Sequence, residues 1–92
     1  MNNIGRLEKK SGLLRILLFL EEKGEYMLSD IWKDSDISRN SGIDALDELK
    51  ELKLLKSRID STKYPPRNLI SLTEKGHSVA QKLKEIEEIL KG

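Results

Sequence analysis

Residues 37–55 decide the fold: they read Ile-Ser-Arg-Asn-Ser-Gly-Ile-Asp-Ala-Leu-Asp-Glu-Leu-Lys-Glu-Leu-Lys-Leu-Leu. Ser38 can cap a helix, because its hydroxyl can accept a hydrogen bond from a backbone amide of the first turn. Apolar residues then recur at helical spacing, which predicts a helix over about residues 38–53 that packs along one side. These apolar residues are Ala45, Leu46, Leu49 and Leu52.

The opposite side of this helix should face outward, since each helical residue turns about 100° on from the last. Gly42 falls on the inward side, where the absence of a side chain permits a close approach by a neighbouring helix. The residues expected on the outward side are Asn40, Ile43, Asp44 and Asp47.

A hairpin and a second capped helix follow this segment. Residues 54–61 alternate loosely as a strand, and residues 68–72 form the returning strand. Pro65-Pro66 lies between them, and proline cannot donate a backbone hydrogen bond, so this segment is a loop tip or an edge. Thr73 then caps the last helix. A helix-turn-helix closed by a two-stranded hairpin can present a helix to the major groove of DNA and a hairpin to the flanking backbone.

The amino-terminal half should hold two further helices and a short strand. Residues 11–22 are densely apolar, with Ser11 as a candidate N-cap and Gly24 as the stop. Residues 26–28 suit a small strand, and Ser29 can cap a brief helix that runs to about Lys33 with Trp32 turned inward. The predicted fold class is mainly α with a small β-hairpin, divided into an amino-terminal segment (1–10), the main domain (11–73) and a last helix (74–92).

The last helix carries a narrow apolar stripe at alternating four- and three-residue steps, which is typical of a coiled-coil seam. We expect it to form a homodimer, with a possible contribution from the first long helix. The dimer residues predicted in this way are Leu13, Leu17, Val79, Leu83, Ile86, Ile89 and Leu90.

Composition bounds the function. The 92 residues hold no cysteine and one histidine, His77, which we interpret as a surface residue. Disulfides, thiolate zinc sites and histidine-rich metal sites are excluded. We find no nucleophile–base pair and no glycine-rich phosphate loop, so we expect neither an enzyme nor a cofactor. Residues 13–20 are too few for a membrane span and no secretory signal is evident, so we expect a cytoplasmic protein.

Charge is balanced overall and uneven locally. Lys and Arg number 17 against 16 Asp and Glu, for a formal net charge of +1. Positive charge is concentrated in residues 1–15 and in the hairpin, which has four basic residues and one acidic residue, Asp60. High Lys and Glu content with a single glutamine is typical of heat-adapted proteins. The hairpin bases are Lys56, Arg58, Lys63 and Arg67.

The chain resembles the winged helix-turn-helix family of small transcriptional regulators over about residues 13–83. Two motifs carry the resemblance: Ile37-Ser38-Arg39 leading into Leu46-x-x-Leu49-x-x-Leu52, and Leu72-Thr73-Glu74-Lys75-Gly76 after the hairpin. It is similar to the MarR-like and PadR-like groups and to minimal archaeal-type regulators. The resemblance implies a homodimer that binds double-stranded DNA and represses by occupying its operator, with no effector visible in the sequence.

By this resemblance, residues 38–53 form the recognition helix and residues 60–68 the wing, which meets the DNA backbone or minor groove. The recognition-helix residues nearest the groove are Ser38, Arg39, Asn40, Ser41, Ile43, Asp44 and Asp47. The DNA-contacting residues of the wing and its strand are Lys56, Arg58, Lys63, Tyr64 and Arg67.

Two features depart from the family pattern, and several side chains have a second interpretation. Lys53 stands where these families commonly have a glycine, and the outward face of the recognition helix is acidic. An acidic face also suits a winged-helix adaptor that binds a basic protein and reads no DNA. Arg39 can contact a base or pair with Asp36, and Tyr64 can stack on a partner or fold back onto the wing. The basic residues of the wing can equally be solvated side chains that protect an edge strand from aggregation.

Overall fold

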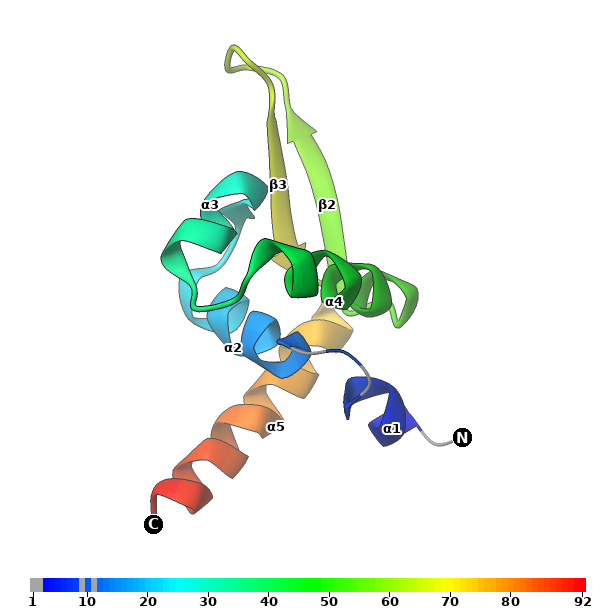
Figure 1. Cartoon of the computed structure of the whole chain (residues 1–92), viewed down its shortest axis with the longest axis vertical. Helices are drawn as coiled ribbons and strands as arrows, with labels where there is room; N and C mark the ends of the chain where they lie inside the picture. Colours follow the sequence, from blue (N-terminus) through cyan, green and yellow to red (C-terminus); the bar gives the residue numbers. More distant parts are fainter. Residues whose placement is uncertain (1–2, 9, 11) are drawn as a thin grey trace.

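A computed structural model of the chain describes residues 3–8, 10 and 12–92. The wing hairpin projects from one side of the body, and the carboxyl end of the last helix projects from the opposite side (Figure 1). In chain order the elements are α1 (Asn3–Glu8), α2 (Leu13–Lys23), β1 (Tyr26–Met27), α3 (Leu28–Asp34), α4 (Arg39–Glu51), β2 (Leu55–Asp60), β3 (Arg67–Leu72) and α5 (Glu74–Lys91).

The strands form an antiparallel sheet in the order β1-β3-β2. Tyr26 of β1 pairs with Ile70 of β3, and Ile70 also pairs with Ser57 of β2. Opposed residues in an antiparallel pair share a face, so the face that carries Ile70 covers the core. The predicted hairpin is confirmed, and β1 adds a third strand at its base.

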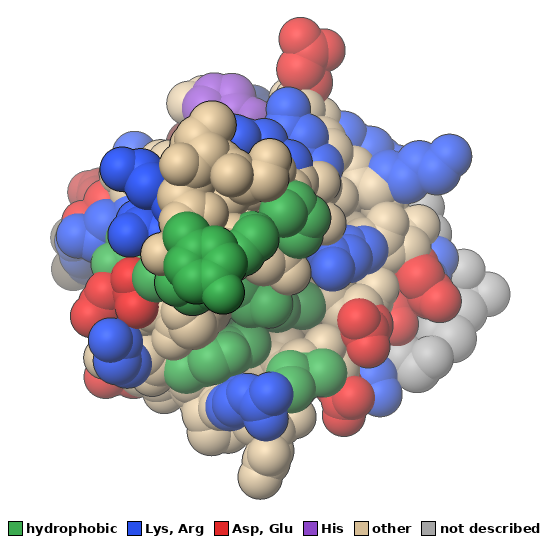
Figure 2. Space-filling view, turned by 90° about the horizontal axis from the view of Figure 1, so that it is seen from above, with side chains coloured by type: hydrophobic (Ala, Val, Ile, Leu, Met, Phe, Trp, Pro, Cys, Tyr) green, Lys and Arg blue, Asp and Glu red, His purple; other side chains and the backbone are tan. Residues whose placement is uncertain are grey.

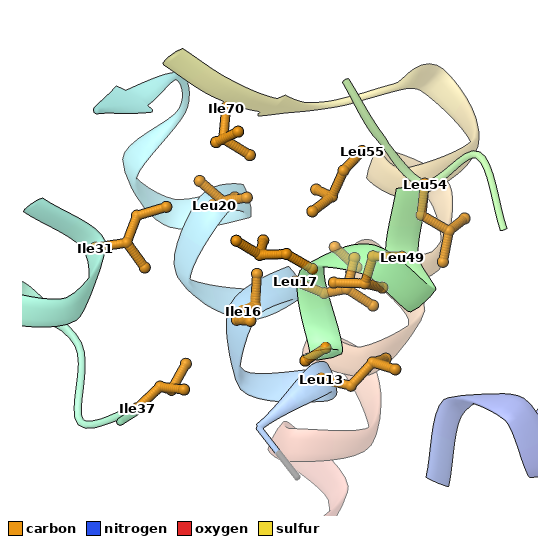
Figure 3. Close-up of a cluster of buried hydrophobic side chains, with 13 residues drawn as sticks. Leu13, Ile16, Leu17, Leu20, Ile31, Ile37, Leu49, Leu54, Leu55 and Ile70 are labelled. Carbon is orange, nitrogen blue, oxygen red and sulfur yellow. The ribbon is translucent and has the colours of Figure 1, made fainter. Parts of the chain in front are cut away.

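Helix α2 lies at the centre of the core, which explains why so many of its sides are apolar. Its side chains contact buried residues of α3, α4 and the sheet (Figure 3). Leu13, Ile16, Leu17 and Leu20 are between 0% and 2% exposed. The helix therefore occupies the centre of the domain.

The predicted helix ends are confirmed at three positions. The Ser38 hydroxyl oxygen accepts from the Ser41 amide at 3.4 Å, and the Thr73 hydroxyl oxygen accepts from the Gly76 amide at 3.0 Å. Gly24 ends α2.

Two predicted caps differ in the structure. Ser11 lies outside the described residues, and the N-cap of α2 is Gly12, whose φ is 83°. Ser29 lies inside the first turn of α3, because β1 leads directly into the helix and Met27 occupies the N-cap position. The prediction for Ser29 was therefore wrong by two residues.

The turn after α4 and the first turn of α5 are tied together, and we call this region the junction (residues 52–54 and 73–76). The Thr73 amide donates to the Leu54 carbonyl at 3.0 Å, and its hydroxyl donates to the Lys53 carbonyl at 2.7 Å. The Lys75 ammonium donates to the Leu52 carbonyl at 3.2 Å. These bonds satisfy the carbonyls of the turn that follows α4.

Stereochemistry at the junction is tight. A Cβ on Gly76 would lie 2.0 Å from the Leu54 carbonyl oxygen, so no side chain fits there. Lys53 has a φ of 62°, the left-handed region that glycine occupies most easily. The Lys53 position therefore keeps the backbone conformation that a glycine commonly provides in this family, although the residue is different.

Candidate nucleic-acid interface

Helix α4 has one buried and one open side, as its spacing predicts. Ala45, Leu46 and Leu49 are 0%, 4% and 0% exposed. The opposite side reaches solvent along its whole length, and Ile43 is 37% exposed there. The exposed residues of this side are Arg39, Asn40, Ser41, Ile43, Asp44 and Asp47.

Helix α3 packs closely against the start of α4 through Trp32. A Cβ on Gly42 would lie 2.1 Å from the Trp32 ring, so the glycine is needed for this approach. Trp32 is half-buried and packs against the core cluster, which confirms its predicted inward position. This contact sets α3 against α4 as a helix-turn-helix pair.

An ion pair joins α1 to the buried side of α4, and the sequence analysis did not predict it. Glu48 is 7% exposed, and its carboxylate accepts from the Arg6 guanidinium of α1 at 2.8 Å. Arg6 also lies 3.4 Å from Glu51. Glu48 stands beside Leu49 on the apolar side of the helix, and a charge in that position signals a buried partner. The partner could not be named, since it lies 42 residues away in the sequence.

The wing tip, residues 61–66, is fully open to solvent. Asp60 shapes its first turn by accepting from the Thr62 hydroxyl at 2.5 Å and from the Thr62 amide at 3.1 Å. These hydrogen bonds lower the pKa of Asp60, with smaller contributions from the charges of Arg58 and Lys63. Tyr64 is 99% exposed, so it does not fold back onto the wing.

Arg58, one of the predicted DNA-contacting residues, is exposed and forms an ion pair within the protein. Its guanidinium donates two hydrogen bonds to Glu25, at 2.8 and 2.7 Å. These bonds lower the pKa of Glu25 and raise the pKa of Arg58. The pair reaches across β3 at the base of the wing and holds β2 to the segment before β1.

A groove of about 720 Å³ runs between the wing, α3 and the start of α4. Apolar residues of β1 and α3, the wing tip and two arginines line it: Met27, Leu28, Trp32, Tyr64, Pro65, Pro66, Arg39 and Arg67. From the wing side, hydrophobic side chains gather near the centre of the molecule with both basic and acidic side chains around them (Figure 2). The groove joins the outward side of α4 to the wing.

Several charged residues of the wing and of the outward side of α4 form no ion pair in the described part of the chain. Arg39, Lys63 and Arg67 form no ion pair there, and neither do Asp44 and Asp47. The alternative pairing of Arg39 with Asp36 is therefore absent. Cations and carboxylates left open in this way can bind an external partner.

Solved structures of regulators share this arrangement. ZitR of Lactococcus lactis, solved as a double variant, superposes with a TM-score of 0.73 at 30% identity over 86% of this chain and 53% of its own. A Porphyromonas gingivalis W83 protein assigned to the MarR family of transcriptional regulators gives 0.70 at 24% identity, over 89% and 79%. The fold is the winged helix-turn-helix of MarR-type transcriptional regulators.

A transcriptional regulator homologue of Pyrococcus horikoshii OT3 has the same winged-helix fold over 96% of both chains, with a TM-score of 0.69 and 22% identity. The present winged helix spans about half the length of the ZitR chain. No family model and no curated protein matches the sequence.

The carboxyl end of α5 leaves three aliphatic side chains open to solvent. Ile86, Ile89 and Leu90 are 50%, 74% and 76% exposed. Val79 and Leu83 are half-buried against the core of the same chain. The predicted dimer residues Leu13 and Leu17 require correction: at 1% and 0% exposure they have no surface left for a second copy.

His77 has a partner that sequence analysis did not foresee. Its Nδ1 lies 2.5 Å from Glu21 of α2, whose side chain is only 6% exposed, while His77 itself is 58% exposed as predicted. The pair helps to hold α5 against α2. Among the residues that the structure describes, no three His, Asp or Glu are grouped to hold a metal, and no helix has the length and apolar character of a membrane span.

Proposed function

We propose that this chain is a sequence-specific DNA-binding regulator that acts as a homodimer in the cytoplasm. Helix α4 enters the major groove, and the wing lies on the flanking backbone or in the minor groove. The regulator represses transcription by occupying its operator.

One observation carries the proposal: α4 is docked by its inner side, so its outer side stands open beside a wing whose cations are free. Arg39 and Arg67 line the same groove, Lys63 lies on the wing tip, and none of the three forms an ion pair within the described chain. Phosphates are the anions that such an arrangement of cations binds, and phosphate contacts supply much of the affinity for DNA.

The side chains of α4 favour direct readout of bases. Arg39 can donate to guanine, and Asn40 can bind adenine through both of its amide atoms. Asp44 and Asp47 repel phosphates but can accept from the amino group of cytosine. We therefore propose a half-site that contains cytosine, with weak binding to unrelated sequences.

The homodimer supports this function geometrically. Ile86, Ile89 and Leu90 lie at the far end of α5, beyond the domain's own core. Pairing these ends buries apolar surface and relates two α4 helices by a two-fold axis. The matching operator is a palindrome whose half-sites lie about one helical turn apart, roughly 10 base pairs.

Selection of bound duplexes from a random pool tests the proposal. We expect enrichment of a palindrome, with preference lost at one position per half-site in N40A and at another in D47N. Q81A, an exposed change on α5 away from α4, should select the wild-type sequence. A pool that shows no enrichment at low salt would overturn the proposal.

The acidic side of α4 favours a second function, a winged-helix adaptor that binds a basic protein. Asp44, Asp47 and Glu51 are all exposed on this helix. The adaptor predicts that the wild-type protein binds no duplex and that D44N/D47N creates no sequence preference. The DNA-binding proposal predicts that the same double change weakens binding to the selected site and strengthens binding to unrelated duplexes.

A further inference from the structure

The wing tip holds an aromatic side chain with nothing of its own to pack against. Tyr64 is 99% exposed at the end of the hairpin, and Pro65 and Pro66 beside it are also exposed. A tyrosine buries a large apolar ring when it finds a partner, so leaving it in water forgoes that stabilisation. Ile59 on β2 is also 63% exposed.

This tip is stiff, which suits a side chain that enters a partner. Asp60 closes the first turn through its two hydrogen bonds from Thr62. Each proline restricts its own φ and the conformation of the residue before it. Tyr64 is thus presented on a backbone that loses little conformational entropy on binding, which is the advantage of preorganisation.

The charge around the ring matches DNA. Lys63 precedes Tyr64 and Arg67 follows the prolines, and neither forms an ion pair within the described chain. Asp60, the acid nearest to the tip in sequence, is already hydrogen-bonded to Thr62. A ring between two cations that form no ion pair is complementary to a base step between two phosphate strands.

We infer that the wing tip is a minor-groove wedge, an inference that rests on the proposed DNA-binding function. The Tyr64 ring enters the minor groove, with Pro65 and Pro66 behind it, and partly unstacks one base step. Lys63 and Arg67 hold the phosphates on either side. Apolar wedges of this kind bend the duplex toward the major groove, and pyrimidine–purine steps such as TA deform most easily.

The wedge makes Tyr64 a determinant of specificity at a position that α4 does not reach. The regulator should prefer a TA or CA step where the wing meets the DNA, outside the base pairs read in the major groove. The preference arises from the deformation energy of the step, so it requires no hydrogen bond from the tyrosine hydroxyl.

Bending and affinity measured together test the wedge. The probe is the selected duplex, labelled at both ends for energy transfer, with binding followed by anisotropy. Y64A should bind at least tenfold more weakly, because the dimer loses one base–aromatic stack from each of its two wings, and should leave the duplex straight. Y64F should bind and bend as the wild type does.

The controls separate this inference from the function on which it rests. S61A alters an exposed tip residue and should leave both the DNA affinity and the bend angle unchanged. Replacing the flanking TA step by AA should weaken the wild type and not Y64A. Thermal unfolding of Y64A should match the wild type, because the ring packs on nothing.

Two results would overturn the wedge. A wild-type complex with a straight duplex, or a Y64A complex that binds and bends as before, would remove the wedge and leave the DNA-binding function intact. A wild-type protein that binds no duplex would remove both.

Discussion

The junction and the wing tip lie at opposite ends of β2 and β3, and they use their side chains in opposite ways. At the junction, Thr73 and Lys75 bind backbone carbonyls of the same chain, and Gly76 leaves no room for a side chain. At the tip, Tyr64 reaches solvent and Lys63 has no ion pair in the described structure. The junction fixes the angle at which the wing leaves the body, and the tip carries the chemistry that the wing presents.

This contrast separates stability from binding. Changes at the junction should alter the free energy of unfolding, because Thr73 and Lys75 bind backbone carbonyls of the same chain and Gly76 packs against Leu54. Changes at the tip should alter binding to DNA and leave unfolding as it is. The end of α5 resembles the tip in its exposure but is aliphatic, which suits a second copy of the chain more than a nucleic acid.

The largest effect is expected for G76A. Its Cβ would meet the Leu54 carbonyl oxygen at 2.0 Å, so the start of α5 must move away from the turn after α4. We expect a loss of about 3 kcal/mol in the free energy of unfolding, measured in urea. S78A, an exposed change on the same helix, is the control. Wild-type stability in G76A would show that the junction is not the constraint described.

The next largest effect is expected at the end of α5. I86D/I89D should convert a dimer into a monomer in sedimentation, because it places charges on a surface that pairing would bury. Loss of the second half-site should weaken operator binding by about 100-fold. E85Q/E88Q changes exposed positions of the same turns and should remain dimeric. A dimer that persists in I86D/I89D would place the interface elsewhere.

A smaller effect is expected from reversing charge on the wing. K63E/R67E should weaken binding about tenfold on every sequence, because phosphate contacts carry no sequence information. The slope of affinity against salt should also fall. Reversal at Arg58 is not equivalent, since it would break the pair with Glu25. Unchanged affinity in K63E/R67E would remove the wing from the interface.

Lys53 allows a stabilising change at the junction. K53G should raise the free energy of unfolding by about 1 kcal/mol, because a left-handed conformation costs a residue with a side chain about that much. K50G, inside α4, should lower it by about 1 kcal/mol. A K53G protein no more stable than the wild type would mean that its φ of 62° carries no strain.

The smallest effect is a pH dependence at the base of the wing. Arg58 lowers the pKa of Glu25 below its usual 4.5, so the pair stabilises the fold above that pH and the contribution is lost as pH falls through the folded pKa. The wild type should therefore exceed E25Q slightly in thermal midpoint at pH 6, and the difference should vanish in strong acid. A difference that grows on acidification would contradict this sign.

Periodicity and capping were enough to predict most of the frame. The spacing of Ala45, Leu46 and Leu49 correctly gave the buried side of α4, and Ser38 and Thr73 cap the predicted helices. The hairpin followed from two strand-like runs on either side of a double proline. Each of these signals lies within a few residues of the structure that it specifies.

The side-chain pairs could not be predicted in this way, because they join distant segments. Arg6 is 42 residues from Glu48, and Glu25 is 33 from Arg58. No local pattern in the sequence shows which of the 17 Lys and Arg residues pairs with a given Asp or Glu. The prediction of Leu17 as a dimer residue was wrong for a different reason. A helix that is apolar on several sides suits the centre of a domain and a dimer interface equally, and only the packing of the folded chain distinguishes the two.

Salt dependence of binding to the selected duplex tests the central claim most directly. If Arg39, Lys63 and Arg67 of both protomers contact phosphates, six counterions are displaced, and the logarithm of affinity should fall against the logarithm of salt with a slope of about −5. A slope near zero, or no binding to any duplex at low salt, would contradict the account.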